Sequence, residues 1–134
     1  MSSGSASGTE DVLAASRALL GVVARSLSRV LQVTRLDDYR ALVILAGHGP
    51  TARRTLMQML GSGALAADES IRRLSAAGML RTDDDVVALT PRGRSVVDEV
   101  SERRRREIAH ILASMKEPDR TQVARVLAEF ARAA

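Results

Sequence analysis

The sequence contains no cysteine, and this absence excludes several classes of function. Without a thiol the chain has no disulfide framework, thiolate zinc site, iron–sulfur cluster, cysteine nucleophile or thiol redox switch. The two histidines, His48 and His110, lie far apart in the sequence, so a metal or catalytic centre built on histidine is not expected within one subunit. We therefore expect neither a cofactor nor a bound metal.

Aromatic residues make up only 1% of the chain, with Tyr39 and Phe130 as the representatives. This scarcity disfavours RNA-binding folds that stack bases on aromatic platforms. No apolar run approaches the ~20 residues of a membrane span. The N-terminus, MSSGSASGTED, is polar and lacks the pattern of a signal peptide. We therefore expect a cytoplasmic protein without a membrane partner.

The 134 residues present have the composition of one globular domain, with 46% hydrophobic and 27% charged residues. The basic residues are 19 arginines and the single Lys116 against 16 acids, which gives a net charge of +4. Arginine suits phosphate and base edges because its planar guanidinium binds them with two parallel hydrogen bonds. A genome biased toward arginine codons would produce the same composition, so the charge alone does not establish a nucleic-acid partner.

The spacing of hydrophobic residues predicts a mainly helical chain with a small β-hairpin. Residues 1–8 are rich in serine and glycine and are expected to be disordered, whereas residues 9–134 are expected to form a single domain. Thr51, Ser62 and Thr90 are the expected N-caps of three internal helices. The expected elements are helices over 9–31, 37–46, 51–60, 62–77 and 91–115, strands over 79–82 and 85–89 joined by Asp83-Asp84, and a last helix after Glu117-Pro118-Asp119.

The middle of this order predicts a winged helix-turn-helix. It consists of a short helix, a turn at Gly61, a second helix and a hairpin. In this motif the second helix enters the major groove of DNA, the first crosses the backbone, and the hairpin reaches the adjacent minor groove. The expected recognition helix is Ser62–Ala77.

From about Leu36 to the C-terminus the sequence resembles the MarR family of bacterial transcription regulators. The segments that carry the resemblance are LDDYRALVILAGHGP (36–50), LMQMLG (56–61), IRRLSAAGML (71–80) and LTPRGR (89–94). The resemblance implies a winged helix-turn-helix core at about 36–91, between dimerisation helices at about 9–31 and 91–134. It also implies a homodimer that binds double-stranded DNA, usually as a repressor, and that responds to a small-molecule effector bound between the dimerisation helices and the winged domain.

Two features depart from the family pattern, and both concern the contact with DNA. The family's recognition helix often opens with serine, proline and hydroxyl residues before an arginine, whereas this sequence reads GALAADE at 63–69. The wing is shorter than usual, and its tip reads Asp83-Asp84-Asp85 without an arginine. These acids keep an alternative open, in which a winged-helix dimer acts through protein–protein interaction.

The candidate DNA contacts are polar residues of the two central helices and the hairpin, namely Arg53, Arg54, Ser62, Glu69, Ser70, Arg72, Arg73 and Arg81. Arg53 and Arg54 are expected to bind phosphate, because they lie at a helix N-terminus. For Arg73, packing under the wing or pairing with an acid is an equal alternative. Glu69 can accept a hydrogen bond from a cytosine amine, and the alanines and leucine at 64–67 can contact only thymine methyl groups.

Apolar stripes at both ends of the chain exceed what one core of this size needs, and a second copy would cover them. The expected dimer interface comprises Leu13, Leu20, Val23, Ile108, Ile111, Val126, Leu127 and Phe130. By the resemblance, Tyr39 and His48 are candidates for the effector pocket, although core or rim positions are the commoner alternative. No catalytic triad, phosphate-binding loop or dinucleotide fingerprint is present, so an enzyme is not expected.

Overall fold

The structure is a computed structural model that describes the backbone of residues 2–134 and the side chains from residue 8 onward. The chain divides into two compact units. The first is Val23–Ser101, and the second combines the chain up to Val22 with Glu102–Ala134. In chain order the elements are α1 (Ser2–Leu27), the 3₁₀ helix η1 (Val30–Gln32), α2 (Leu36–His48), β1 (Thr51–Ala52), α3 (Arg53–Leu60), α4 (Ala64–Ala76), β2 (Leu80–Asp83), β3 (Val86–Leu89), α5 (Pro91–Ala113) and α6 (Asp119–Ala133).

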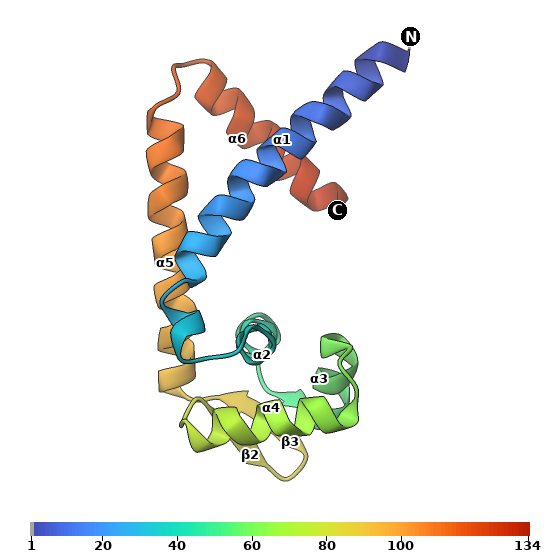
Figure 1. Ribbon diagram of the computed structural model, residues 1–134, viewed down its shortest axis with the longest axis vertical. Coiled ribbons are helices and arrows are strands. Elements are labelled where there is room, and N and C mark those ends of the chain that lie inside the picture. Colours follow the sequence, from blue (N-terminus) through green and yellow to red (C-terminus); the bar gives the residue numbers. More distant parts are fainter. Residues whose placement is uncertain (1) are drawn as a thin grey trace. The chain divides into compact units, whose positions relative to one another are not determined.

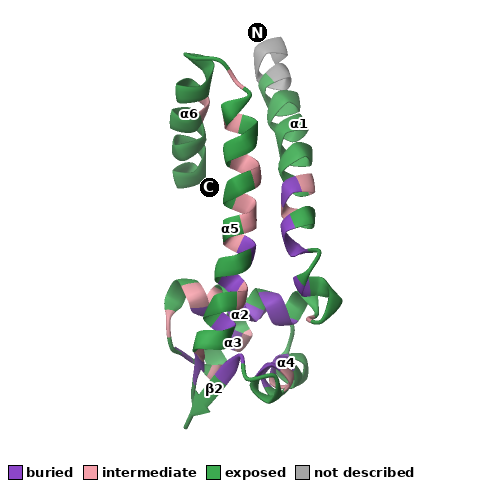
Figure 2. Cartoon of the chain, turned by 90° about the vertical axis from the view of Figure 1, so that its left-hand side faces the viewer, coloured by how far each residue is buried: buried purple, intermediate pink, exposed green. Residues whose placement is uncertain are grey.

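The unit Val23–Ser101 contains a winged helix-turn-helix, as Figure 1 shows. Helix α2 contacts α3, α4 and β3, and its apolar residues Leu42 and Leu45 are almost completely buried. They form one core with Leu56 of α3 and Val87 of β3. Buried positions, purple in Figure 2, lie on the inner faces of these elements. The predicted fold class, mainly α-helical with a small β-hairpin, is confirmed.

The sheet contains one strand that the sequence does not predict. It has three antiparallel strands in the order β1-β3-β2, with Thr51 opposite Val87 and Arg81 opposite Ala88. Thr51 was expected to cap α3, and this is wrong: its Oγ1 donates to the carbonyl oxygen of Gly49 at 2.8 Å. A two-residue strand carries no periodic signal, and only its pairing with β3 defines it.

The turn between α3 and α4 contains two glycines in the left-handed region, Gly61 with φ 68° and Gly63 with φ 84°. Glycine adopts this region without a steric penalty. Gly63 is the N-cap of α4, so the prediction of Ser62 as the cap is wrong, and no side chain caps this helix. The helix therefore begins at Ala64, because the non-helical backbone of Gly63 moves the N-cap by one residue from the expected Ser62.

The hairpin turn and the start of α5 differ only slightly from expectation. The turn residues are Asp84 and Asp85, and Asp84 has a φ of 54°, which aspartate tolerates better than most residues. The predicted cap at Thr90 is confirmed, since the Gly93 N–H donates to Thr90 Oγ1 at 3.1 Å. Gly93 leaves no room for a side chain, because a β-carbon there would lie 2.2 Å from the carbonyl oxygen of Met79.

The second unit holds the chain-terminal helices. Helix α1 begins at Ser2, ahead of the start expected at Thr9, since nothing in the serine- and glycine-rich segment stops a helix as proline would. The expected disorder of residues 1–8 falls on Met1, which lies outside the described residues, and on residues 2–7, whose side chains lie outside them; it stays a prediction. Among the described residues, no helix is long and apolar enough to cross a bilayer.

Candidate nucleic-acid interface

Helix α4 turns a stripe of four residues away from the protein. Ala67, Ser70, Ile71 and Leu74 are buried on its inner face. The opposite face carries exposed residues at spacings of four, three and four, namely Leu65, Glu69, Arg72 and Ala76, which we call the outward stripe. In the helix-turn-helix motif, the exposed face of the second helix is the one that contacts base edges.

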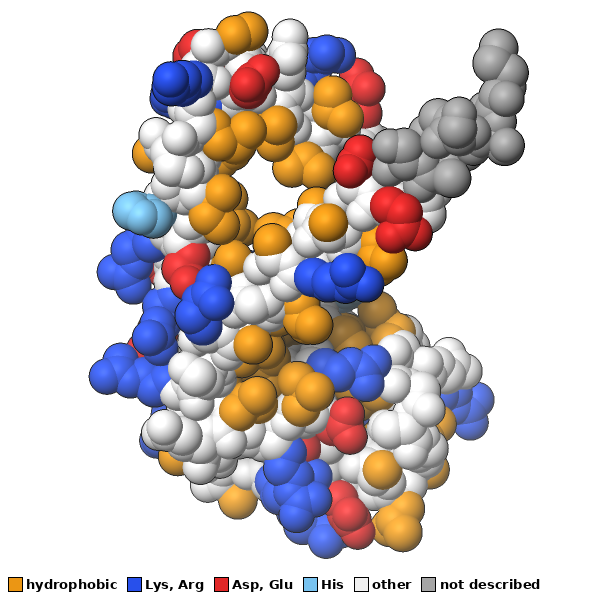
Figure 3. Space-filling view, turned by 45° about the horizontal axis from the view of Figure 1, so that its top comes forward, with side chains coloured by type: hydrophobic (Ala, Val, Ile, Leu, Met, Phe, Trp, Pro, Cys, Tyr) orange, Lys and Arg blue, Asp and Glu red, His pale blue; other side chains and the backbone are white. Residues whose placement is uncertain are grey.

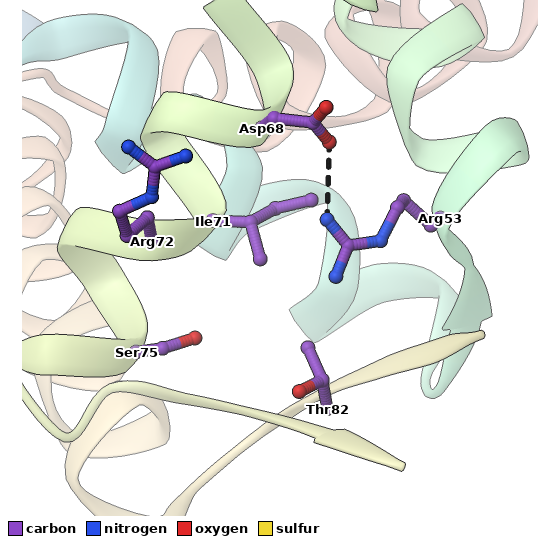
Figure 4. A pocket seen from close by; sticks show the side chains of 6 residues that line it. All are labelled: Arg53, Asp68, Ile71, Arg72, Ser75 and Thr82. Carbon is purple, nitrogen blue, oxygen red and sulfur yellow. Dashed lines mark hydrogen bonds and ion pairs between the residues drawn. The ribbon is translucent and has the colours of Figure 1, made fainter. Parts of the chain in front are cut away.

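On one side of the outward stripe, Asp68 pairs with Arg53, the first residue of α3. Arg53 Nη1 lies 3.0 Å from Asp68 Oδ1, and both side chains are partly exposed. The pair lies at the edge of a hollow of about 360 Å³, and Figure 4 shows Ile71 beside the pair and Thr82 of β2 across the hollow from Asp68. The sequence prediction of Arg53 as a phosphate contact did not include this counter-charge.

The backbone at the start of α3 is also engaged. The Arg53 N–H donates to the carbonyl oxygen of Asp85 in the wing turn at 2.8 Å. One of the amide groups that would attract a phosphate to this helix N-terminus is therefore used within the protein. Arg54, the next residue, is exposed and has no ion pair with the described residues.

On the other side of the outward stripe, Arg73 is fixed by Asp38 of α2. Arg73 donates through Nε to Asp38 Oδ2 and through Nη2 to Asp38 Oδ1, both at 2.9 Å. The Ser70 hydroxyl donates to Asp38 Oδ1 at 2.6 Å. Burial alone would raise the pKa of Asp38, but these hydrogen bonds outweigh it and hold the pKa below the ordinary value of 3.8. Asp38 in turn raises the pKa of the Arg73 guanidinium.

This cluster corrects the prediction for Ser70. Its side chain is only 4% exposed and its hydroxyl serves Asp38, so Ser70 does not face a duplex. For Arg73 the arrangement favours the alternative in which this side chain pairs with an acid over the one in which it contacts a phosphate. The sequence gives no distinct signal for the cluster, because Asp37 and Asp38 both read as the acids that the first turn of a helix favours.

The remaining candidate contacts are on the surface. Arg72 on α4 and Arg81 on β2 are exposed, and Ser62 is exposed in the turn before α4. Glu69 is also exposed, with Oε2 4.0 Å from Arg73 Nη1. Arg54 on α3, Arg72 on the outward stripe and Arg81 on β2 are thus exposed cations of this unit, while the wing tip is acidic. Arg72 lines the hollow of about 360 Å³ with Thr82, whereas the neighbouring Arg81 lines a separate hollow with Pro50 and Asp84.

The two candidate effector residues lie at opposite ends of α2. Tyr39 is 5% exposed and belongs to the core, whereas His48 is exposed at the C-terminal end, with Nδ1 3.1 Å from the carbonyl oxygen of Ile44. The structure does not bring them together, and their role in binding an effector stays a prediction. A different hollow, of about 370 Å³, is lined by Arg35, Arg92 and the paired Asp38 and Arg73, and by Val33, Thr34, Leu74, Ala77 and Met79.

The predicted interface residues leave apolar surface uncovered in the single chain. In the second unit Leu20 is 66% exposed and Phe130 56% exposed, and Leu13, Ile111, Val126 and Leu127 are exposed as well. Ile108 and Val23 are half-buried. Figure 3 shows hydrophobic side chains, in orange, open to solvent on the chain-terminal helices.

Comparison with solved structures gives close matches over the whole chain. Rv1404 from Mycobacterium tuberculosis is 35% identical, with 94% of this chain and 91% of that chain covered and a TM-score of 0.82. The transcriptional regulator Tm0710 from Thermotoga maritima is 22% identical, with 95% and 94% covered and a TM-score of 0.78. A MarR family protein from Bacillus stearothermophilus is 19% identical, with 98% and 96% covered and a TM-score of 0.80. No protein-family model and no curated protein matches the chain.

Proposed function

We propose that this chain, which belongs to the MarR family of winged helix-turn-helix transcription regulators, represses transcription as a homodimer bound to double-stranded DNA. The observation that carries the proposal is the outward stripe of α4. Leu65, Glu69 and Arg72 point away from the protein, while the two flanking ion pairs hold the orientation of the helix. A partner with phosphates on both sides of a groove fits this arrangement, because Arg54 on α3 and Arg81 on the wing add exposed cations to the same unit.

The homodimer is supported by the apolar surface of the chain-terminal helices. Side chains such as Leu20 and Phe130, more than half exposed in the single chain, would be covered by a second copy. A two-fold dimer presents two recognition helices, which bind half-sites about one helical turn apart in a pseudo-palindromic operator. We also propose a cytoplasmic location, as the sequence predicts, because a bacterial regulator has to reach chromosomal DNA.

The test is binding to duplex DNA across a salt series, measured by fluorescence anisotropy. Each neutralised phosphate contributes roughly 0.9 to the slope of log affinity against log salt. Arg54→Ala removes one cation from each subunit and should flatten the slope by about 1.8. The matched control is Arg29→Ala, because Arg29 is also exposed but lies outside α3, α4 and the hairpin and pairs with Glu99 at 3.2 Å. An unchanged slope in Arg54→Ala would contradict the assigned contact.

A second candidate function follows from the acidic wing. Asp83, Asp84 and Asp85 are all exposed and would repel phosphates in a minor groove. If the wild-type protein binds no duplex even at low salt, the DNA proposal fails. A protein partner with a basic surface then becomes the better explanation of this acidic tip.

We also infer a small-molecule effector, as the family resemblance implies. In the hollow of about 370 Å³, Asp38 already neutralises Arg73, so Arg35 and Arg92 are the cations that would bind an aromatic carboxylate against the apolar walls. Benzoate is the simplest probe, and titration calorimetry with the wild type and with Arg92→Ala would test the site. Saturable binding that Arg92→Ala abolishes is expected; equal binding by both proteins would place the ligand elsewhere.

A further inference from the structure

We propose that Leu65 reads the C5 methyl group of a thymine in each DNA half-site, so that this residue determines part of the sequence specificity. The proposal rests on the proposed function, because it names what the outward stripe of α4 contacts in the major groove. The apolar group that base pairs present in the major groove is the thymine methyl. An exposed aliphatic side chain aimed into that groove can therefore recognise thymine and no other natural base.

The first observation is the exposure of Leu65. The side chain is 73% exposed, although leucine is normally among the more buried residues. It is the second residue of α4, at the N-terminal end that contacts base edges in helix-turn-helix proteins. A single exposed leucine needs no explanation in general, so its position on the helix has to support the assignment.

The second observation is the phase of the helix. Leu65 lies on the outward stripe four residues before Glu69 and seven before Arg72, so the three side chains follow one another along the same face. Glutamate accepts from the cytosine amine and arginine donates to guanine or phosphate. Leu65 supplies the apolar contact in a row whose other members are polar.

The third observation is the chemistry around Leu65. Its neighbours Ala64 and Ala66 carry no hydrogen-bonding groups, and the preceding turn holds Gly61 and Gly63. Hydrogen bonds from this end of the helix to base edges are therefore limited to Ser62 and the backbone. Discrimination here has to come from shape and apolar contact.

The surroundings also select DNA over an apolar protein partner. Leu65 is the large apolar side chain exposed on α4, and the next two members of the outward stripe, Glu69 and Arg72, are charged. A protein-docking surface built on hydrophobic contact presents a larger contiguous apolar patch. A lone aliphatic group in a row with Glu69 and Arg72 is complementary to a thymine methyl group among the polar edges of neighbouring base pairs.

The test compares thymine with deoxyuridine, which lacks only the methyl group. A bound site is first selected from random DNA with the full-length wild-type dimer. Each thymine of that site is then replaced by deoxyuridine, symmetrically in both half-sites, and binding is measured by fluorescence anisotropy. At one position, the replacement of thymine by deoxyuridine in both half-sites should weaken wild-type binding about 15-fold. Burial of one methyl group contributes roughly fourfold per half-site, and the two half-sites multiply.

The Leu65→Ala variant makes the test specific. It should bind the unmodified site more weakly and should be insensitive to deoxyuridine at that same position, while responding normally to other base changes. The control is Leu36→Ala, because Leu36 is also exposed, at 52%, but lies at the start of α2. This control should retain the wild-type response to deoxyuridine.

The possible outcomes separate this proposal from the proposed function. If the wild type binds DNA but Leu65→Ala responds to every deoxyuridine as the wild type does, the assignment of Leu65 is wrong and DNA binding stands. If the wild type binds no duplex, both proposals fall. Thermal unfolding of Leu65→Ala should match the wild type, because so exposed a side chain contributes little to the fold.

Discussion

Arg53 and Asp68 form an ion pair, with 3.0 Å between Nη1 and Oδ1, that joins the first residue of α3 to the recognition helix. The carboxylate occupies one side of the guanidinium that the sequence assigns to a DNA phosphate. A phosphate that approaches Arg53 has to compete with Asp68 or share the cation with it. Because both side chains are more than a third exposed, solvent weakens the pair and the competition is feasible.

Asp68→Asn should therefore strengthen non-specific binding to DNA. The substitution removes a negative charge beside the duplex and leaves Arg53 available to phosphate. The salt slope should steepen by up to about 1.8, for one additional phosphate contact in each subunit. Anisotropy across a potassium chloride series measures this.

The matched control for this prediction is Asp98→Asn, which makes the same change of charge at an exposed position on α5. It should leave the slope near the wild-type value. Equal salt slopes for Asp68→Asn and the wild type would mean that Arg53 does not contact a phosphate.

Asp38→Asn should destabilise the winged domain by about 2 kcal/mol, because the buried carboxylate accepts hydrogen bonds from Arg73 and Ser70. Urea unfolding at pH 7 measures the difference. Asp37→Asn is the control, since Asp37 precedes Asp38 on α2 but is exposed. A loss of similar size in both variants would show that a general charge effect, and not the cluster, stabilises the domain.

The difference in folding stability between the wild type and Asp38→Asn should depend on pH. The pKa of Asp38 in the folded protein lies below its ordinary value of 3.8, so the carboxylate stabilises the folded state above about pH 4. That contribution is lost as the pH falls through the folded pKa. The stability difference between wild type and Asp38→Asn should thus be constant from about pH 5 to 7 and shrink below about pH 4. A difference that grows on acidification would contradict the ion pair.

Gly93→Ala should destabilise the protein by about 1–3 kcal/mol, the usual range for forced overpacking. The new β-carbon would lie 2.2 Å from the backbone oxygen of Met79, which also accepts a hydrogen bond from the Thr90 N–H at 3.1 Å. Gly47→Ala is the control, because a β-carbon there meets nothing within 4 Å on a helical backbone. Thermal unfolding should show a lower Tm for Gly93→Ala and an equal or higher Tm for Gly47→Ala; the reverse order would refute the close approach.

Phe130→Ala should weaken the proposed dimer. Phe130 is 56% exposed in the single chain, and truncating a large aromatic side chain in an obligate interface removes much of its contact area. Sedimentation equilibrium at micromolar protein should show a shift toward monomer. Leu65→Ala, which removes an exposed apolar side chain outside the predicted interface, should sediment as the wild type. A wild type that is monomeric at this concentration would end the dimer proposal.

The sequence alone was sufficient to place the main elements and the recognition helix. Hydrophobic periodicity, the left-handed turn at Gly61 and the Thr90-Pro91 start of α5 are local signals, and each acts within a few residues of the chain. The exposed apolar stripes, which include Leu20 and Phe130, could be recognised in the same way because they exceed what one core requires. The family resemblance depended on the order and spacing of these local segments.

Only the tertiary structure decided which polar side chains face outward and which are used inside. Ser70 and Glu69 are neighbours, yet helix phase turns Ser70 toward Asp38, 32 positions away in the sequence, and leaves Glu69 exposed. Arg73 meets Asp38 across 35 positions, and Arg53 meets Asp68 across 15. Strand β1 likewise exists because Thr51 lies opposite Val87. Such pairings depend on how the helices and strands pack, and no local pattern of residue types encodes the distance between two charges on different elements.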